Sequence, residues 1–355
     1  MLEFDHITLG QRVLFGAGRA AENARIEVGR REARSLMVIS DSAEHAVVQQ
    51  ISRDLRPALL YTDVAQHVPI DNAEKACAAA RSHEVDLMIS VGGGSALGLA
   101  KAVALSTGIP IVAIPTTYAG SEATNVWGVT EKNRKTTGVD DAVMPVTVIY
   151  DATLTTTLPA ELSVASGLNA LAHSIDSMWA PRTDPINQAL AVEAVADLTA
   201  GLDAINADPA GVAGHERALM GAYLAAVAFA SAGSGMHHKI CHVLGGAYKL
   251  PHAQTHAVVL PYVLAYNQSA ARSAAQRIAK AFDAPTALEG LQALRSRLRA
   301  PRALRDIGFH QSDIGEAAEL VLPAIPPSNP KAVTLDSITA LLTAAWAGDD
   351  PKEAR

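Results

Sequence analysis

Short apolar runs alternate with alanine-rich segments over the first 150 residues, and this alternation constrains the fold most strongly. The runs 35–40, 85–91, 109–114 and 146–150 are rich in Val, Ile and Leu, whereas 71–83 and 96–105 have the length and composition of helices. Strand, helix and strand in this order predict right-handed βαβ units. We therefore expect a parallel sheet of the Rossmann-like kind in this part of the chain.

The texture changes near residue 162. The segments that follow are rich in Ala and Leu and lack strand signals; they are 162–179, 186–206, 214–232, 258–282 and 287–299. A chain of 355 residues exceeds the usual size of a single core. The sequence thus predicts an α/β fold: a Rossmann-like parallel-sheet domain over 1–155, then an all-helical domain over 156–355, with 151–159 as the linker.

Composition excludes several classes of partner. Hydrophobic residues make up 49% and charged residues 18%, and the net charge is −7 without a basic run, so nucleic acid is not expected. The amino-terminal residues lack the pattern of a signal peptide, and the stretch 221–236 is too short and too polar to span a membrane. Two cysteines, Cys77 and Cys241, form no disulfide framework. A cytoplasmic protein that does not bind membranes is expected.

A glycine turn follows one of the predicted strands. Gly92, Gly93, Gly94 and Ser95 lie between the run 85–91 and the helical segment 96–105. Glycines there let the backbone approach a diphosphate, and a helix N-terminus supplies N–H donors. Ser95 also suits the N-cap position, so a tight turn without a ligand is an equally good interpretation of this fragment alone.

Polar residues at other strand ends favour a dinucleotide. Asp41 follows the run 35–40, where a carboxylate can accept hydrogen bonds from ribose hydroxyls and repel a 2′-phosphate. This favours NAD over NADP, although Asp41 could also simply cap a helix. Thr116 and Thr117 follow the run 109–114, so we expect their hydroxyls at the same edge of the sheet, unless they form an ordinary turn.

Five of the 12 histidines lie within residues 237–256, namely His237, His238, His242, His252 and His256. His238 and His252 would be roughly 21 Å apart on one straight helix. The chain must therefore turn back between them if they share a site, and Gly245, Gly246 and Pro251 are the predicted break.

A further histidine, His173, shares a helix face with Asn169. Together with His238 and His252 it would offer three imidazoles, which suit Zn²⁺ or Fe²⁺. Asn169 supplies a neutral amide where such an ion prefers a carboxylate, so the set resembles a vestigial metal site. A single histidine of this kind could be an ordinary hydrogen-bonded helix residue, but that interpretation accounts poorly for the group. Cys241 is interpreted as a small buried hydrophobic residue.

These motifs resemble the iron-containing (group III) alcohol dehydrogenase family. The resemblance rests on residues 92–101, 115–122, 167–173 and 237–242 and on Pro251-His252, in that order. The chain departs from the metal-dependent members at three positions. It has Asn169 and Gly98 where they have Asp, and it has Tyr118 within the Thr-Thr motif. All three departures resemble the maleylacetate reductases of that family.

The resemblance implies an NADH-dependent enzyme of aromatic-compound breakdown. It would reduce the carbon–carbon double bond of maleylacetate to 3-oxoadipate, without a bound metal and commonly as a homodimer. His242 would lie near the nicotinamide as donor or general acid, and Lys135 would contact the cofactor. His173, His238 and His252 would bind the anionic dicarboxylate substrate.

Further substrate contacts are expected from Tyr118, Asn169, His237 and Lys239, with Arg134 as another candidate. Two alternative functions remain open. One is a metal-dependent alcohol or polyol dehydrogenase of the same fold, which Asn169 disfavours. The other is a non-catalytic NAD-binding relative, which the glycine turn and the dense histidines disfavour.

Overall fold

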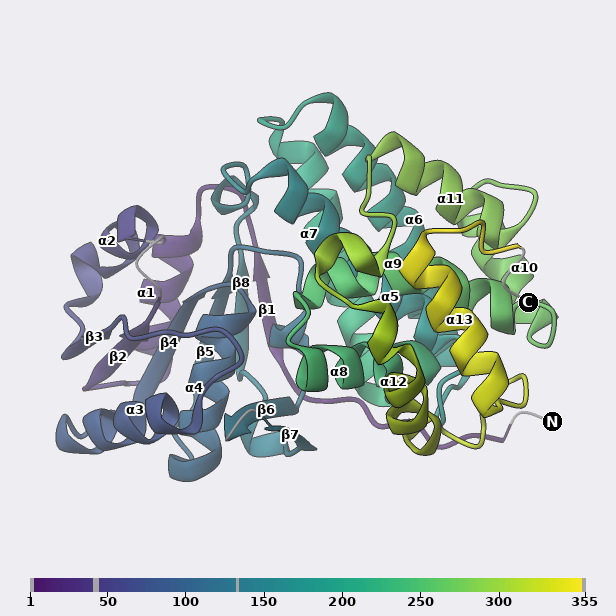
Figure 1. Ribbon diagram of the computed structural model, residues 1–355. Coiled ribbons are helices and arrows are strands. Elements are labelled where there is room, and N and C mark those ends of the chain that lie inside the picture. The colour runs from purple at the N-terminus through teal and green to yellow at the C-terminus, as the bar shows by residue number, and fades with distance from the viewer. Residues whose placement is uncertain (1–2, 41–44, 132–133, 353–355) are drawn as a thin grey trace. The chain divides into compact units, whose positions relative to one another are not determined.

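The computed structural model (Figure 1) describes residues 3–40, 45–131 and 134–352. The chain forms two compact units. The sheet unit comprises Leu9–Leu158 and Ala210–Leu219, and the helical unit comprises Met1–Thr8, Pro159–Pro209 and Met220–Arg355. The main change of unit, after Leu158, lies close to the predicted boundary at 155, whereas the two short segments belong to the unit opposite to the one predicted.

The sheet unit contains a six-stranded parallel sheet with the order β1-β8-β5-β4-β2-β3. Its strands are β1 (Arg12–Phe15), β2 (Leu36–Ile39), β3 (Leu59–Tyr61), β4 (Leu87–Gly92), β5 (Ile111–Pro115) and β8 (Thr147–Tyr150). Its helices are α1 (Ala20–Arg30), α2 (His45–Leu55), α3 (Ile70–Ser82) and α4 (Gly94–Thr107). The predicted parallel sheet is confirmed.

Apolar residues on both faces of the strands account for the layered architecture. Successive side chains of a strand point to opposite faces of the sheet. On one face, Val38, Ile89 and Ile114 of β2, β4 and β5 form a core with residues of α1 and α2. Val48 and Ile51 are the buried residues that α2 adds to this core. Figure 1 shows α1 and α2 on one side of the sheet and α3 and α4 on the other. A parallel sheet covered on both faces needs such continuous hydrophobic strands.

Several elements escaped the sequence patterns. The strands β1 and β3 are only four and three residues long, and their exposure is mixed. An antiparallel hairpin of β6 (Val126–Glu131) and β7 (Arg134–Val139) interrupts the parallel order. Both strands carry Thr and charged residues, and none of their described side chains is fully buried, so no continuous apolar run marked them.

The helical unit contains α5 (Ala160–Ser177), α6 (Pro185–Ala207), α8 (Met236–Tyr248), α9 (His252–Asn267), α10 (Arg272–Ala281), α11 (Ala287–Arg297), α12 (Ile314–Val321) and α13 (Leu335–Ala347). The helix α7 (Val212–Ala232) begins in the sheet unit and continues into the helical unit. The all-helical prediction is confirmed. The predicted segment 258–282 is wrong as one element, because the chain leaves the helix after Asn267 and resumes at Arg272.

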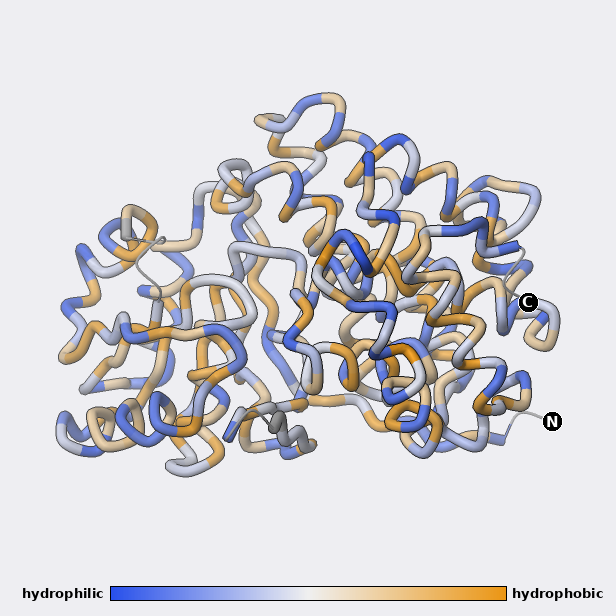
Figure 2. Tube along the Cα trace, viewed as in Figure 1, coloured by the Kyte–Doolittle hydropathy of each residue, from blue (hydrophilic) through white to orange (hydrophobic). Residues whose placement is uncertain are grey.

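A hydrophobic core joins four helices of this unit. Side chains of α8, α9, α12 and α13 form one cluster, with Ile240, Val259, Val321 and Leu342 among its fully buried members. Figure 2 shows hydrophobic residues recurring along the helices with hydrophilic residues between them, which is the pattern of an amphipathic surface helix. Among the described residues no single helix is long and apolar enough to cross a membrane, and only the pair α7 and α8, bent by 96°, meets that criterion jointly.

Candidate active site

The glycine turn lies at the carboxyl end of β4, where the order of the sheet reverses. The chain passes from β2 outward to β3 and then returns to β4 on the other side of β2. Ligands of open α/β sheets bind outside the carboxyl ends of the strands at such a switch point. The predicted cofactor turn therefore occupies the position that the topology favours.

Backbone geometry requires two of the glycines. Gly92 has a φ of +139°, in a region that L-residues rarely adopt. A Cβ on Gly93 would lie 2.9 Å from Cγ2 of Thr117, whereas a Cβ on Gly94 would meet no protein atom within 4 Å. The helix α4 begins at Gly94, and its N-cap residue Gly93 makes no side-chain cap hydrogen bond to its first N–H groups. Such a cradle suits a diphosphate.

Ser95 and the threonines take positions beside this turn. Ser95 lies inside the first turn of α4 and is not the N-cap, which is Gly93, so its predicted capping role is wrong. Thr116 donates its backbone N–H to the carbonyl of Gly92 at 3.2 Å. The structure thus brings Thr116, Thr117 and the glycine turn together, as the sequence predicted.

Three predicted contacts fall outside the described residues or side chains. Asp41 lies outside the described residues, directly after Ser40 at the end of β2. Lys135 and Arg134 belong to β7, and their side chains lie outside the described part of the structure. All three assignments stay predictions.

Tyr118 is a core residue of the sheet unit. Its side chain is completely buried, and its hydroxyl lies 2.6 Å from Nδ1 of His215, which is also 3.0 Å from Oγ1 of Thr155. This placement argues against the predicted substrate contact, because the hydroxyl already has a protein partner. No sequence pattern marked His215, which is 97 positions away.

Lys101 closes the loop that follows the Thr-Thr motif. Its ammonium donates to the carbonyls of Ser121, Thr124 and Val126 at 2.7 to 2.9 Å and to Oγ1 of Thr124 at 3.1 Å. Burial lowers the pKa of Lys101 to about 7, while the nearby carboxylate of Glu122 opposes that shift. Four oxygens around one ammonium favour the charged form. Lys101 therefore fixes the start of β6.

The helical unit gathers six histidines, which we call the histidine cluster: His173, His237, His238, His242, His252 and His256. His173 comes from α5, the next three from α8, and the last two from α9. The ring centroids of His173 and His238 lie 4.9 Å apart in a stacked arrangement, and those of His252 and His256 lie 4.4 Å apart. The cluster passes from fully buried His256 to exposed His252.

The turn that produces the cluster lies later than predicted. The helix α8 continues through Gly245 and Gly246 to Tyr248. The break falls at Lys249, which adopts a left-handed φ of +56°, and at Pro251, the N-cap of α9. The sequence correctly predicted that the chain turns back between His238 and His252. The two glycines, however, lie inside α8, and the helix ends after them at Tyr248.

Asp176 organises the cluster and was not predicted. Its carboxylate lies 2.8 Å from Nδ1 of His238 and accepts backbone N–H groups of Gly235 and His237 at 2.9 and 3.3 Å. A Cβ on Gly235 would collide with this carboxylate, which accounts for the glycine before α8. Asp176 follows His173 by three positions, so helical spacing could have revealed it.

Burial determines the ionisation of the inner histidines. Desolvation lowers the pKa of His173 to about 4 and that of His237 to about 3, with neighbouring histidines adding to the latter shift. The pKa values of His238 and His256 are lowered well below the usual range, also chiefly by burial. Burial raises the pKa of Asp176 to about 7, although backbone N–H donors oppose the shift. The inner imidazoles are therefore neutral at pH 7.

Five buried atoms of this region have no hydrogen-bond partner among the described residues: Asn169 Oδ1, His173 Nδ1, His237 Nδ1, His238 Nε2 and His256 Nε2. Buried polar atoms in folded proteins normally have partners, so a concentration of unpaired ones indicates a place for a ligand or water. Asn169, predicted to face the substrate, is thus a buried residue whose carbonyl oxygen is available.

Lys239 and the exposed histidines complete the predicted site residues. Lys239 lies on α8 between His238 and His242 and is partly exposed, and its positive charge lowers the pKa of Asp176 slightly against the effect of burial. His242 is partly exposed, and its ring centroid lies 6.0 Å from that of His238. His237 is almost completely buried, which disfavours its predicted contact with the substrate.

The vestigial metal set lacks a carboxylate ligand. Two nitrogens bound to one Zn²⁺ at about 2.0 to 2.1 Å lie at most about 4.2 Å apart. Among the described residues, the one set of three His, Cys, Asp or Glu donor atoms all within 4.8 Å of one another is His237, Cys241 and His256. The donors of His173, His238 and His252 are not gathered in this way, and Asn169 adds no charge.

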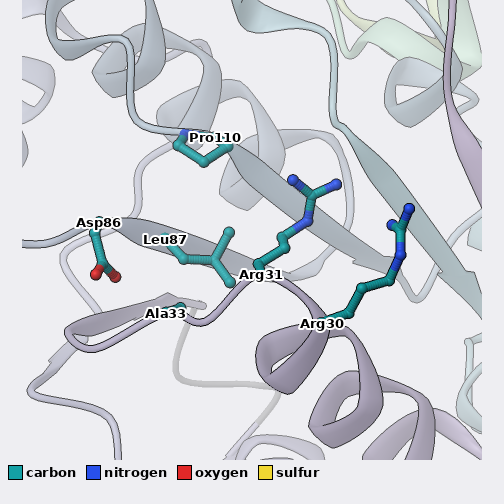
Figure 3. A pocket seen from close by; sticks show the side chains of 6 residues that line it. All are labelled: Arg30, Arg31, Ala33, Asp86, Leu87 and Pro110. Carbon is teal, nitrogen blue, oxygen red and sulfur yellow. The ribbon is translucent and has the colours of Figure 1, made fainter.

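A cavity of about 400 Å³ lies elsewhere in the sheet unit. Figure 3 shows its lining residues: Arg30, Arg31, Ala33, Asp86, Leu87 and Pro110. These residues lie at or before the amino-terminal ends of β2, β4 and β5, whereas the glycine turn lies at the carboxyl end of β4. The cavity is therefore separate from the predicted cofactor site.

The sequence pattern of the family described as iron-containing alcohol dehydrogenase matches residues 10–152, and that of its C-terminal domain matches 163–346. The chain therefore belongs to the iron-containing alcohol dehydrogenase family, and it is an NAD(H)-dependent oxidoreductase. A crystal structure of an iron-containing alcohol dehydrogenase from Corynebacterium glutamicum is 54% identical, with a TM-score of 0.98 and complete coverage of both chains.

Within this family the chain is similar to maleylacetate reductases. Maleylacetate reductase 1 of Rhodococcus opacus is 40% identical over 344 residues, which is 96% of each chain. The crystal structure of maleylacetate reductase from Agrobacterium tumefaciens is 36% identical, covers 99% of this chain and 100% of its own, and gives a TM-score of 0.92.

Proposed function

We propose that this chain reduces the carbon–carbon double bond of maleylacetate with NADH, giving 3-oxoadipate, and that turnover needs no bound metal. The observation that carries the proposal is Asn169, because an uncharged amide stands beside the imidazoles where a divalent ion prefers a carboxylate. Relatives named maleylacetate reductases, similar over nearly the whole chain, support the choice of substrate.

The reaction differs from alcohol oxidation in the charge that it develops. Bound NADH would supply a hydride to the carbon β to the ketone, and the electrons of the double bond would move onto the ketone oxygen as an enolate. An enolate is much less basic than the alkoxide of an alcohol dehydrogenase. Preorganised hydrogen-bond donors can stabilise it, where an alkoxide benefits from a Lewis acid.

Residues of the chain supply the remaining steps. The first N–H groups of α4, beyond Gly93 and Gly94, would bind the diphosphate of NADH. His242, the partly exposed histidine of α8, would deliver the proton to the carbon α to the ketone, which restores the ketone. Imidazole N–H groups of His173, His238 and His252, together with Lys239, would bind the carboxylates of the substrate.

The preference for NADH over NADPH rests on Asp41. A carboxylate at the end of β2 would accept the ribose hydroxyls and repel a 2′-phosphate. We therefore expect kcat/KM to be higher with NADH; a higher value with NADPH would remove this part of the proposal. Asp41→Ala should reduce the ratio between the two cofactors.

The direct test is NADH oxidation with maleylacetate, with and without a chelator. Turnover that persists after metal removal, together with 3-oxoadipate as product, is expected. Loss of turnover on chelation, restored by Fe²⁺ or Zn²⁺, would support instead a metal-dependent dehydrogenase, to be tested with simple alcohols.

A matched variant sharpens this choice. Asn169→Asp restores the carboxylate of metal-dependent relatives and adds a negative charge near an anionic substrate. We expect it to lower maleylacetate turnover and to increase binding of added Fe²⁺. Faster maleylacetate reduction in this variant would contradict a role for the neutral amide.

Assembly and location are further proposals. We propose a homodimer, as is common in the family, and a cytoplasmic enzyme. Light scattering of the purified protein and fractionation of cells that produce it measure these two properties.

A further inference from the structure

His237, Cys241 and His256 form a compact group of donors within the histidine cluster. His237 and Cys241 are four positions apart on α8 and share one face, and α9 places His256 opposite them. Nε2 of His237 lies 2.9 Å from Nδ1 of His256, and Sγ of Cys241 lies 3.6 Å from Nε2 of His237. All three side chains are at most 1% exposed.

These separations are close to those of a tetrahedral ion. With bonds of about 2.05 Å to nitrogen and about 2.3 Å to sulfur, tetrahedral geometry places two nitrogens about 3.4 Å apart and nitrogen and sulfur about 3.6 Å apart. The nitrogen–sulfur distance already agrees. The two nitrogens need to separate by about half an ångström, which small rotations of the rings can provide.

One ligand of the group would become negatively charged when an ion binds. Burial raises the pKa of Cys241 well above its usual value, with the charge of Asp176 adding to the effect, so the thiol is protonated without an ion. An ion would replace that proton. The thiolate would cancel one of the two positive charges of a divalent cation, which lowers the cost of burying the ion.

We propose that His237, Cys241 and His256 bind a thiophilic divalent ion of the Zn²⁺ type. Two imidazoles and a thiolate are the ligands that favour such an ion over Mg²⁺ or Ca²⁺. None of the three belongs to the inherited set of Asn169, His173, His238 and His252, so this site is different from the family's metal position. The ion links α8 to α9 and is structural, and the site is independent of the proposed reaction.

Co²⁺ is the probe, because a thiolate bound to this ion gives a charge-transfer absorption band that imidazoles and carboxylates do not. The full chain is stripped of metal and titrated with Co²⁺ under reducing conditions. We expect the band to saturate at one equivalent and to disappear when one equivalent of Zn²⁺ is added. The melting temperature should rise with either ion.

Variants assign the ligands. Cys241→Ser should lose the band, whereas Cys77→Ser should keep it, since Cys77 is the other buried free cysteine and lies in the sheet unit. His256→Gln retains the thiolate and should bind Co²⁺ at least tenfold more weakly. Circular dichroism verifies that each variant is folded, and the His256 variant replaces the Cys241 variant if the latter does not fold.

No band with wild-type protein, or a band that persists in Cys241→Ser and vanishes in Cys77→Ser, would overturn the proposed site. Activity is measured separately on metal-free protein. If the metal-free protein does not turn over maleylacetate but the Co²⁺ titration gives the band, the proposed function is contradicted and the proposed site is retained. Turnover without any band would do the reverse.

Discussion

The glycine turn and the histidine cluster offer a ligand different kinds of atom. The turn presents backbone N–H groups of α4, and its glycines keep side chains out of the way. The cluster presents side-chain nitrogens that are largely buried, several without partners among the described residues. The first site is defined by the absence of side chains, and the second by their concentration.

This difference predicts how substitutions should act. A change at the turn alters the space available to the cofactor and should affect its binding. A change in the cluster alters donors that are proposed to bind the substrate and should affect the rate. A variant at either site that produced the opposite effect would break the comparison.

The largest effect is expected at His242. Removing this proposed general acid should lower kcat by about 10²- to 10⁴-fold, while KM for NADH changes little. His242→Ala is compared with His310→Ala, an exposed histidine of the same unit, in steady-state assays with maleylacetate. An unchanged kcat in His242→Ala would show that another group donates the proton.

Lys101 shows what a satisfied buried polar group contributes. Lys101→Met leaves the carbonyls of Ser121, Thr124 and Val126 without their donor and Glu122 without a nearby cation. We expect the free energy of unfolding to fall by about 3 to 5 kcal/mol in urea titrations. Lys75→Met, at an exposed position of α3, should change it by less than about 0.5 kcal/mol.

Acid should destabilise the histidine cluster. The folded pKa values of His173 and His237 are lowered to about 4 and about 3, so below pH 6.5 the unfolded chain binds protons that the folded chain does not. The stability that these histidines contribute above pH 6.5 is then lost as the pH falls toward 4, and Asp176, whose pKa is raised to about 7, has the opposite effect over the same range. At about 1.4 kcal/mol per pKa unit, each histidine accounts for a loss on the order of 3 kcal/mol.

His173→Phe tests this origin. A phenyl ring can stack on His238 and Phe229 as the imidazole does, and it removes both the titration and the unpaired Nδ1. The free energy of unfolding should depend less steeply on pH between 6.5 and 4 in this variant. An unchanged slope would assign the acid sensitivity to other groups.

The smallest effect, about tenfold in KM for NADH, is expected at the turn. Gly94→Ala adds a methyl group that meets no protein atom. Weaker NADH binding at constant kcat would therefore indicate that the methyl group clashes with the bound diphosphate. Gly93→Ala would instead crowd Thr117, and Thr117→Ser should relieve it by removing Cγ2. If Gly94→Ala bound NADH normally, the diphosphate would have to lie elsewhere.

The sequence predicted the sheet more completely than the cluster. Strands such as β4 and β5 are continuous apolar runs, and consecutive glycines directly after a strand indicate a sharp turn or a close backbone approach. The cluster depends on contacts between distant positions, such as Asp176 with His238 and His237 with His256, which no local pattern specifies. Cys241 was interpreted from its residue type alone, whereas its surroundings give it a second role as a proposed ligand.

Tyr118 is a residue for which the sequence predicted a contact that the structure disfavours. A tyrosine beside a predicted cofactor motif is a reasonable substrate contact, but His215 from α7 takes its hydroxyl. Sequence proximity to a site does not determine the direction in which a side chain points. The tertiary partner determines it.

The distribution of the chain between the units has a consequence for recombination. The sheet unit includes Ala210–Leu219, which the helical half of the sequence encodes, and the helical unit includes Met1–Thr8 from the beginning of the chain. A crossover between homologous genes at codon 158 would therefore pair His215 of one parent with Tyr118 of the other, and His6 with a foreign Asp184, whose carboxylate it approaches at 2.7 Å. Chimeras divided at this codon would therefore contain two contacts between residues of different parents. An exchange of the sheet unit should include both Leu9–Leu158 and Ala210–Leu219.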